Sequence, residues 1–269
     1  MGNLGDITLR TLDTLARVDY IASEDTRVTK KLLSYYQIKK PLFSYHAYNF
    51  SESAKKIISL VREGFRVALV SDAGMPTIQD PGKELISLLE RENIQFEVLP
   101  GPSALILGVV YSGFKGEGFL FLGFLPRKKG ERKRALKEAF QQSQKIVLYE
   151  SPQRLLSLLE EISQVGEGDR QLVICRELTK IHQEIKRGQV ERIKEELIAQ
   201  GRELKGEIVL VIEGKEPPVA REEITRLTQE LRKKGLTQRD IVEVINLTFG
   251  VGKNVAKKYT QSVQAVDFS

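Results

Sequence analysis

The sequence predicts an α/β protein in which short strands alternate with helices. Apolar runs rich in β-branched or aromatic residues recur along the 269-residue chain, at 20–22, 67–70, 96–99, 119–124, 146–149, 172–175 and 208–212. Short runs of this kind are typical of buried strands. The stretches between them place apolar residues on one helical face, most clearly at 53–63 and 155–162. This alternation favours an architecture with a largely parallel sheet in the first half of the chain.

Two breaks in composition divide the chain into three parts. Three glycines fall within residues 113–118, and the adjacent Pro217 and Pro218 follow the last predicted strand. Glycine and proline are the strongest local signals that an element ends. We therefore predict an N-terminal α/β domain over residues 1–113, a second α/β domain over 118–215, and a helical tail over 219–269.

The tail shows helical patterns and no strand patterns. Ile224 and Leu231 belong to one apolar face, and Thr237 with Asp240 resembles a capping box that opens a second helix. A glycine turn precedes a third predicted helix, which carries Lys253, Lys257 and Lys258. Three short helices of this kind are typical of a helix-turn-helix, and a small helical cap with a solvated basic face is the alternative.

Composition narrows the function classes. The chain has 42 Lys and Arg against 36 Asp and Glu, a net charge of +6, which is compatible with a polyanionic partner without requiring one. The only cysteine, Cys175, lies in an apolar run and is expected to be a small buried side chain. One cysteine and two histidines argue against a disulfide framework and a structural zinc site. Neither a membrane-spanning run nor a signal peptide is expected, so we predict a cytoplasmic protein.

Polar and Gly/Pro residues gather directly after the predicted strands, at 23–27, 71–82, 100–104 and 150–152. Open α/β sheets bind ligands at the carboxyl ends of their strands, so these loops predict a ligand site, although any strand-to-helix loop favours Gly, Asp and Pro. The sequence lacks the glycine motifs of Rossmann and P-loop nucleotide sites. A Rossmann-type methyltransferase is therefore disfavoured.

Ten short strings resemble, in order, the bacterial small-subunit rRNA (cytidine-2′-O)-methyltransferases of the tetrapyrrole-methylase superfamily. They are GNLGD at 2–6, SEDTR at 23–27, SYH at 44–46, SDAG at 71–74, DPG at 80–82, GPSA at 101–104, FLGFLP at 121–126, YESP at 149–152, RELTK at 176–180 and KGE at 205–207. Each string alone is weak, but ten in order are highly specific. The tail is similar to the small helix-turn-helix extension of that family.

The resemblance implies the two-domain tetrapyrrole-methylase fold, a non-Rossmann fold that binds S-adenosylmethionine (SAM) between its domains and works as a homodimer. The implied substrate is a cytidine in the decoding region of 16S rRNA, in naked RNA or in the assembled small ribosomal subunit. The implied cofactor contacts are Asp72, Ala73, Gly74, Ile78, Ser103, Ala104, Tyr149 and Gly206.

Two features depart from the family pattern. Met75 and Thr77 stand where the family usually has Thr and Gly. The family also has an apolar strand just before the GNLGD string, whereas Met1 directly precedes Gly2 here. We expect that strand to lie within the first sheet, so the chain as written should be poorly stable and nearly inactive. A misassigned start is favoured over a genuine short form.

Transfer of a methyl group to a ribose 2′-oxygen requires in-line positioning and removal of the hydroxyl proton. The strand-end candidates for a base are Glu24, Asp25, His46 and Glu150. We predict Asp25 as the base and Arg27 as a clamp on phosphate or substrate. The alternatives are a helix start enriched in acids for Glu24 and Asp25, and an ordinary loop residue for His46.

A run of cations follows the predicted strand at 119–124. Its members are Arg127, Lys128, Lys129, Arg132, Lys133 and Arg134. We interpret this run as a contact to RNA phosphates, with a solvated helix start as the alternative.

Two other functions stay open. The first is a corrinoid or porphyrin-precursor methylase of the same fold, against which the basic run and the tail argue. The second is a non-catalytic RNA-binding relative, which need not bind SAM.

Overall fold

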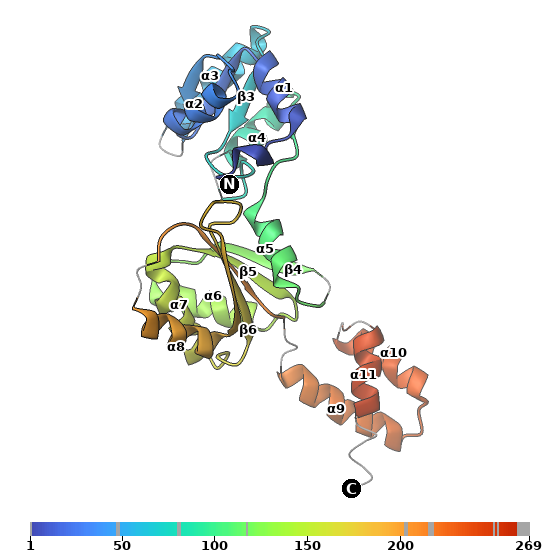
Figure 1. Ribbon diagram of the computed structural model, residues 1–269. Helices are drawn as coiled ribbons and strands as arrows, with labels where there is room; N and C mark the ends of the chain where they lie inside the picture. Colours follow the sequence, from blue (N-terminus) through green and yellow to red (C-terminus); the bar gives the residue numbers. More distant parts are fainter. Residues whose placement is uncertain are drawn as a thin grey trace. The chain divides into compact units, whose positions relative to one another are not determined.

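The computed structural model of the protein describes residues 2–46, 49–79, 82–116, 118–201, 204–214, 218–249, 251 and 253–262. Its elements follow one another along the chain as Figure 1 shows. They are η1 (Leu4–Asp6), α1 (Leu9–Arg17), β1 (Tyr20–Ser23), α2 (Thr26–Tyr35), β2 (Leu42–Ser44), α3 (Phe50–Arg62), β3 (Val67–Val70), α4 (Lys83–Arg91), α5 (Ala104–Ser112), β4 (Phe119–Phe124), α6 (Lys129–Ala139), β5 (Lys145–Glu150), α7 (Pro152–Gln164), β6 (Gln171–Arg176), β7 (Glu184–Gln189), α8 (Val190–Gln200), β8 (Ile208–Ile212), α9 (Pro218–Lys233), α10 (Gln238–Phe249) and α11 (Lys253–Ser262).

Contacts within the chain group it into two compact units. One holds residues 1–113, 121–125 and 147–211, and the other holds 114–120, 126–146 and 212–269. The three-domain division at 1–113, 118–215 and 219–269 stays a prediction. The strings at 80–82 and around Pro217, Gly250 and Gly252 lie wholly or partly outside the described residues.

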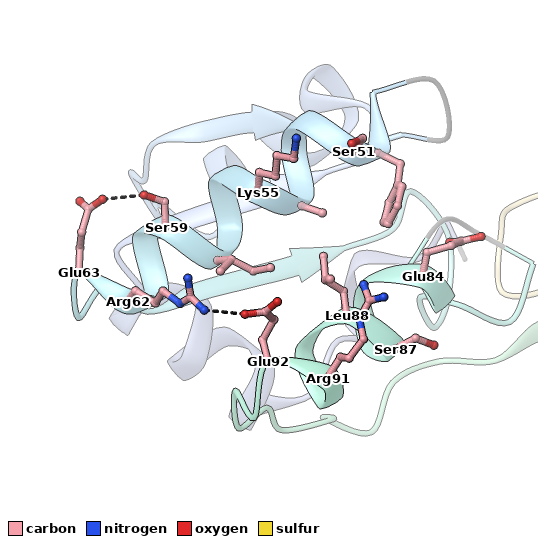
Figure 2. Close-up of a pocket in the computed structure, with 13 residues that line it drawn as sticks. Ser51, Lys55, Ser59, Arg62, Glu63, Glu84, Ser87, Leu88, Arg91 and Glu92 are labelled. Atoms are coloured by element: carbon pink, nitrogen blue, oxygen red, sulfur yellow. Dashed lines mark hydrogen bonds and ion pairs between the residues drawn. The ribbon is translucent and has the colours of Figure 1, made fainter.

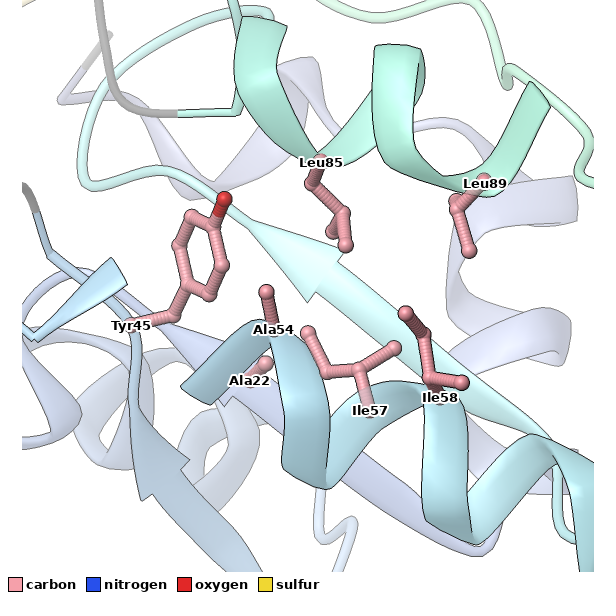
Figure 3. Close-up of a cluster of buried hydrophobic side chains, with 7 residues drawn as sticks. All are labelled: Ala22, Tyr45, Ala54, Ile57, Ile58, Leu85 and Leu89. Atoms are coloured by element: carbon pink, nitrogen blue, oxygen red, sulfur yellow. The ribbon is translucent and has the colours of Figure 1, made fainter. Parts of the chain in front are cut away.

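The first sheet has three parallel strands in the order β2-β1-β3. Helices α3 and α4 cover one face through the buried cluster that Figure 3 shows, which consists of Ala22, Tyr45, Ala54, Ile57, Ile58, Leu85 and Leu89. Leu15 and Leu33, on α1 and α2, pack against Ile21 on the other face. Both faces of β1 are thus buried, and the prediction of parallel pairing in the first half is confirmed.

The prediction of a strand at 96–99 is wrong. These residues have no strand structure, and Phe96 and Val98 are exposed. Within the described residues β3 pairs only with β1, and every residue of β3 is half-buried. A strand requires a neighbour that accepts and donates its backbone hydrogen bonds, and among the described residues no strand pairs with this segment. The expectation that the family's apolar strand before the GNLGD string lies within this sheet stays a prediction.

The second sheet has five strands in the order β4-β5-β8-β6-β7, with β6 and β7 antiparallel. Its four strand predictions, at 119–124, 146–149, 172–175 and 208–212, are confirmed. The central strand β8 is buried along its whole length, as expected for a continuous Ile/Leu/Val run. Cys175 is buried as predicted, and burial raises the pKa of its thiol to about 11, so it stays protonated.

The tail forms the three predicted helices. Ile224 of α9, Ile241 and Ile245 of α10 and Ala256 of α11 build its core. The predicted cap is present, since the backbone N–H of Asp240 donates to Thr237 Oγ1 at 3.3 Å. The helix-turn-helix function of the tail stays a prediction.

Among the helices of the described residues, none combines the length and apolar character needed to cross a membrane. The described residues also contain no group of three or more His, Cys, Asp or Glu side chains that could hold a metal ion.

Helix α7 offers a matched test of core packing. Leu158 is 0% exposed, whereas Leu156 on the same helix is 42% exposed. We expect Leu158→Ala to lower the free energy of unfolding by about 2–5 kcal/mol, because it deletes buried methyl groups and leaves a cavity. Leu156→Ala should change it by no more than about 0.5 kcal/mol. Urea unfolding followed by circular dichroism measures both, and equal losses would contradict this packing.

Candidate active site

The carboxyl ends of the three strands of the first sheet meet at one edge. Ser23 of β1 pairs in register with Ser44 of β2 and Val70 of β3. The strings that follow, at 23–27, 44–46 and 71–74, therefore begin side by side. One hydrogen bond joins two of them directly, because the backbone N–H of Asp25 donates to Asp72 Oδ1 at 3.0 Å.

Asp25 is the N-cap of α2 and is paired with Arg27. Asp25 Oδ1 accepts from the backbone N–H of Arg27 at 2.8 Å, and Oδ2 lies 2.6 Å from the Arg27 guanidinium. Hydrogen bonds from the Arg27 side chain and backbone lower the pKa of Asp25 to about 2. A carboxylate with that pKa is a poor proton acceptor at neutral pH. The Arg27 side chain is 87% exposed and can meet an anion from solvent.

Two of the other predicted bases, Glu24 and His46, lie near the same edge, whereas Glu150 ends β5 of the second sheet and is only 2% exposed. Glu24 directly follows β1, and the backbone N–H of His46 donates to Asn49 Oδ1 at 2.8 Å. Between them Tyr45 is buried, and its backbone N–H donates to the Ser23 carbonyl at 2.8 Å. Burial raises the pKa of Tyr45 to about 12, so its hydroxyl stays protonated.

The loop after β3 packs on the loop before α5. A Cβ on Gly74, which has φ +92°, would lie 3.4 Å from the Pro102 carbonyl oxygen. The Met75 sulfur lies against Gly101, 2.9 Å from where a Cβ would stand. Ser103 caps α5 and accepts from Ile106 N–H at 3.5 Å. The structure therefore packs the loop that holds Asp72, Ala73 and Gly74 against the loop that leads to Ser103 and Ala104.

Thr77, which with Met75 departs from the family pattern in this loop, carries backbone strain. Thr77 has φ 73°, a left-handed conformation that glycine adopts freely and a β-branched residue adopts rarely. Its methyl group lies against Gly82, where a Cβ would be 2.8 Å away. Ile78, the next predicted cofactor contact, is exposed.

Tyr149 lies near the end of β5, and Gly206 lies in the turn just before β8 of the second sheet. The Tyr149 ring contacts Phe121 and Phe124, with centroids 5.1 and 5.7 Å apart. Gly206 has φ +99°, and the side chain of Glu177 lies against it where a Cβ would stand.

Glu177 was not among the predicted site residues, although it lies in the RELTK string. Its Oε1 accepts from Glu207 N–H at 2.9 Å and from Lys180 Nζ at 2.8 Å. Burial alone would raise the pKa of Glu177, but these hydrogen bonds outweigh burial and lower it. Glu177 therefore holds the turn that contains Gly206.

The basic run lies at the start of α6. Arg127, Lys128, Lys129 and Arg134 are exposed and Lys133 is half-buried. Arg132 is only 6% exposed and so offers little surface to a phosphate. It faces the interior because it falls one turn before the buried Leu136 on the same helical face.

A groove of about 950 Å³ separates α3 from α4 (Figure 2). Phe50, Ala54 and Leu88 contribute apolar lining, and Arg62 pairs with Glu92 at 2.5 Å. Within the described part of the chain, the predicted site residues do not line this groove.

The sequence model of the family described as Tetrapyrrole (Corrin/Porphyrin) Methylases matches residues 1–194. The chain belongs to this family. A protein from Thermotoga maritima named Ribosomal RNA small subunit methyltransferase I is 50% identical over 80% of this chain and 96% of its own length. A protein of the same name from Haemophilus influenzae is 36% identical over 96% of this chain and 93% of its own length.

Solved structures confirm the predicted tetrapyrrole-methylase fold. A cobalt precorrin-4 methyltransferase superposes with a TM-score of 0.59 at 17% identity, covering 78% of this chain and 90% of that one. A uroporphyrin-III-C-methyltransferase from Thermus thermophilus gives 0.56 at 21% identity, covering 79% and 90%. At these identities the likeness concerns the fold alone.

The pair between Asp25 and Arg27 predicts a pH signature. Because the folded-state pKa of Asp25 is depressed to about 2, its stabilising contribution is present above the unfolded value and is lost as pH falls through about 2. In Arg27→Met the midpoint should rise toward the ordinary value of 3.8. Carboxyl NMR titration measures this, with Arg17→Met, which removes the partner of Asp13, as the control. An unchanged Asp25 midpoint would contradict the pairing.

Proposed function

We propose that this chain transfers a methyl group from SAM to the ribose 2′-oxygen of a cytidine in the decoding region of 16S rRNA. The observation that carries the proposal is the 50% identity, over 80% of this chain, to a protein named Ribosomal RNA small subunit methyltransferase I. The joined strand-end loops and the exposed cations of α6 support it. The corrin and porphyrin methylases share only the fold at 17–21% identity, which does not favour a macrocyclic substrate.

The residues at the first-sheet edge fit SAM. Gly74 permits close backbone approach, and the carboxylate of Asp72 and the hydroxyl of Ser103 lie on the two loops that pack together. We assign the cofactor contacts to Asp72, Ala73, Gly74, Ile78, Ser103, Ala104, Tyr149 and Gly206. Bound SAM supplies an electrophilic methyl group.

Asp25 and Arg27 have different roles in binding the substrate. The exposed guanidinium of Arg27 binds a phosphate or the substrate ribose, and Asp25 orients it through two hydrogen-bonded oxygens. The ribose oxygen must lose its proton as its bond to the methyl carbon forms. Because the pKa of Asp25 is about 2, we assign proton acceptance to Glu24 or His46 at the same edge.

We further infer a homodimer. Helix α5 is apolar almost throughout, yet Ile106, Val110 and Tyr111 are exposed, Val110 at 70%. An exposed apolar helix face of this kind is stabilised when a second copy covers it. A substrate within the small ribosomal subunit also implies a cytoplasmic location.

The decisive experiment is methyl transfer to small subunits from a strain that lacks the modification. Labelled SAM should place one methyl group on the ribose of one decoding-region cytidine, mapped by nuclease digestion and mass spectrometry. Labelling of a corrin or porphyrin precursor with no labelling of rRNA would instead establish the macrocycle reaction. Tight RNA binding without SAM binding would establish a non-catalytic protein.

Asp72→Ala and Gly74→Val should each abolish measurable SAM binding while the protein stays folded. The first removes a carboxylate from the strand-end loop, and the second adds atoms beside the Pro102 carbonyl. Calorimetry measures the affinity, and thermal melting checks the fold. Asp13→Ala, on α1 and outside the loops, is the control. If both folded loop variants kept normal affinity, this loop would not be the cofactor site.

Replacing Arg127, Lys128, Lys129, Lys133 and Arg134 by Gln should weaken RNA binding and flatten its salt dependence. Each phosphate contact contributes about 0.7–0.9 to the slope of log affinity against log salt. Arg132 is kept because it is buried. A control that replaces Lys55, Lys56 and Arg91 should keep the slope. An unchanged slope in the α6 variant would show that these cations are only a solvated face.

A further inference from the structure

Phe124 is an exposed aromatic ring at the end of β4. Its side chain and backbone are 54% exposed, although it ends a strand of the second sheet. The ring is tilted 60° to that of Tyr149 with centroids 5.7 Å apart, and Tyr149 packs edge-on against Phe121. The Phe124 ring therefore contacts a neighbouring aromatic side chain, while much of the residue is exposed to solvent.

The backbone beside Phe124 is held by a buried ion pair. The carbonyl of Leu125, itself buried, accepts from Arg154 Nη2 at 3.0 Å. Arg154 Nε lies 3.4 Å from Oε1 of Glu150, a residue that is 2% exposed. Glu150 Oε1 also accepts from Ser151 N–H at 2.7 Å. A fixed backbone means that little conformational freedom is lost when a ligand covers the ring.

The chemistry near Phe124 favours a nucleic acid base as that ligand. Only two residues separate Phe124 from Arg127, and the exposed Lys128 and Lys129 follow. Chain length alone keeps Arg127 within roughly 11 Å of Phe124. Exposed aromatic rings accompanied by cations are the usual platform for single-stranded RNA, in which bases stack on the ring and phosphates meet the charges.

We propose that Phe124 is a stacking surface for a base of the RNA substrate. The inference rests on the proposed rRNA methylation and adds to it a residue that recognises an unpaired nucleotide. The ring contributes to RNA affinity and leaves SAM affinity unchanged.

The chain contains no tryptophan, so Phe124→Trp introduces a single fluorescent reporter. A decoding-region RNA oligonucleotide should quench its fluorescence with a saturable dependence on concentration. Tyr35→Trp is the matched control, because Tyr35 is 65% exposed and also packs edge-on against a neighbouring ring. The control should show little quenching.

Binding measurements with other variants separate stacking from mere apolar contact. Phe124→Ala and Phe124→Leu should weaken RNA binding about 5- to 150-fold, the range expected for loss of one stacked base. Phe124→Tyr should bind as the wild type does. Phe65→Ala, which removes another partly exposed ring, should leave RNA affinity unchanged. Melting temperatures identify any variant that fails to fold. If Phe124→Ala or Phe124→Leu fails to fold, RNA binding by Phe124→Tyr and Phe124→Trp still tests the inference.

Three results would overturn the inference. They are normal RNA affinity in Phe124→Leu, quenching of Phe124→Trp by SAM alone, and equal quenching by anionic phospholipid vesicles. If the wild type binds and methylates RNA while the Phe124 variants match it, only this inference fails. If the wild type neither binds nor methylates RNA, the proposed function fails and this inference fails with it.

Discussion

The hydrogen bond from the Asp25 backbone to the Asp72 carboxylate links the loop after β1 to the loop after β3. It forms because parallel register sets the ends of these strands side by side. One oxygen of Asp72 thereby accepts a hydrogen bond, and the carboxylate of Asp25 caps α2 and pairs with Arg27. The proposed division of roles, with the cofactor bound by the loop after β3 and the substrate held by Arg27, depends on this bond, since it fixes both loops to the same strand edge.

The loop after β3, which we propose binds the cofactor, combines close packing with backbone strain. Gly74 approaches the Pro102 carbonyl, Met75 fills the space at Gly101, and Thr77 adopts a conformation that costs a non-glycine residue about 1–3 kcal/mol. Strain of this size persists only when the surrounding contacts determine the conformation. Met75 provides such a contact, because its side chain ties the strained loop to the loop that starts α5. Met75 and Thr77, the two residues of this loop that depart from the family pattern, therefore lie close together in one packed loop.

Sequence periodicity predicted the central strands and the edge strands β3 and β4, but it missed the edge strands β2 and β7. The run at 208–212 is apolar throughout because β8 has a strand on each side, whereas β7 at the sheet edge carries Lys186 and Arg187 and shows no strand pattern. The segment at 96–99 is the opposite case, since it has the composition of a strand but pairs with no strand in the described part of the chain. Among site residues, spacing could not show that Arg132 turns inward or that Arg27 lowers the pKa of Asp25. Both depend on three-dimensional neighbours.

The cations at the start of α6 lie where the dipole of the helix disfavours positive charge. A helix N-terminus bears partial positive charge, so Lys128 and Lys129 there are unfavourable by a few tenths of a kcal/mol each. Glu131 in the first turn offsets part of this through its ion pair with Lys128 at 3.3 Å. A phosphate at the same place would be attracted by both the side chains and the free N–H groups of the first turn. The unfavourable arrangement in the free protein is thus one that the proposed RNA binding would relieve, which is a physical reason to propose that these cations serve the substrate rather than the fold.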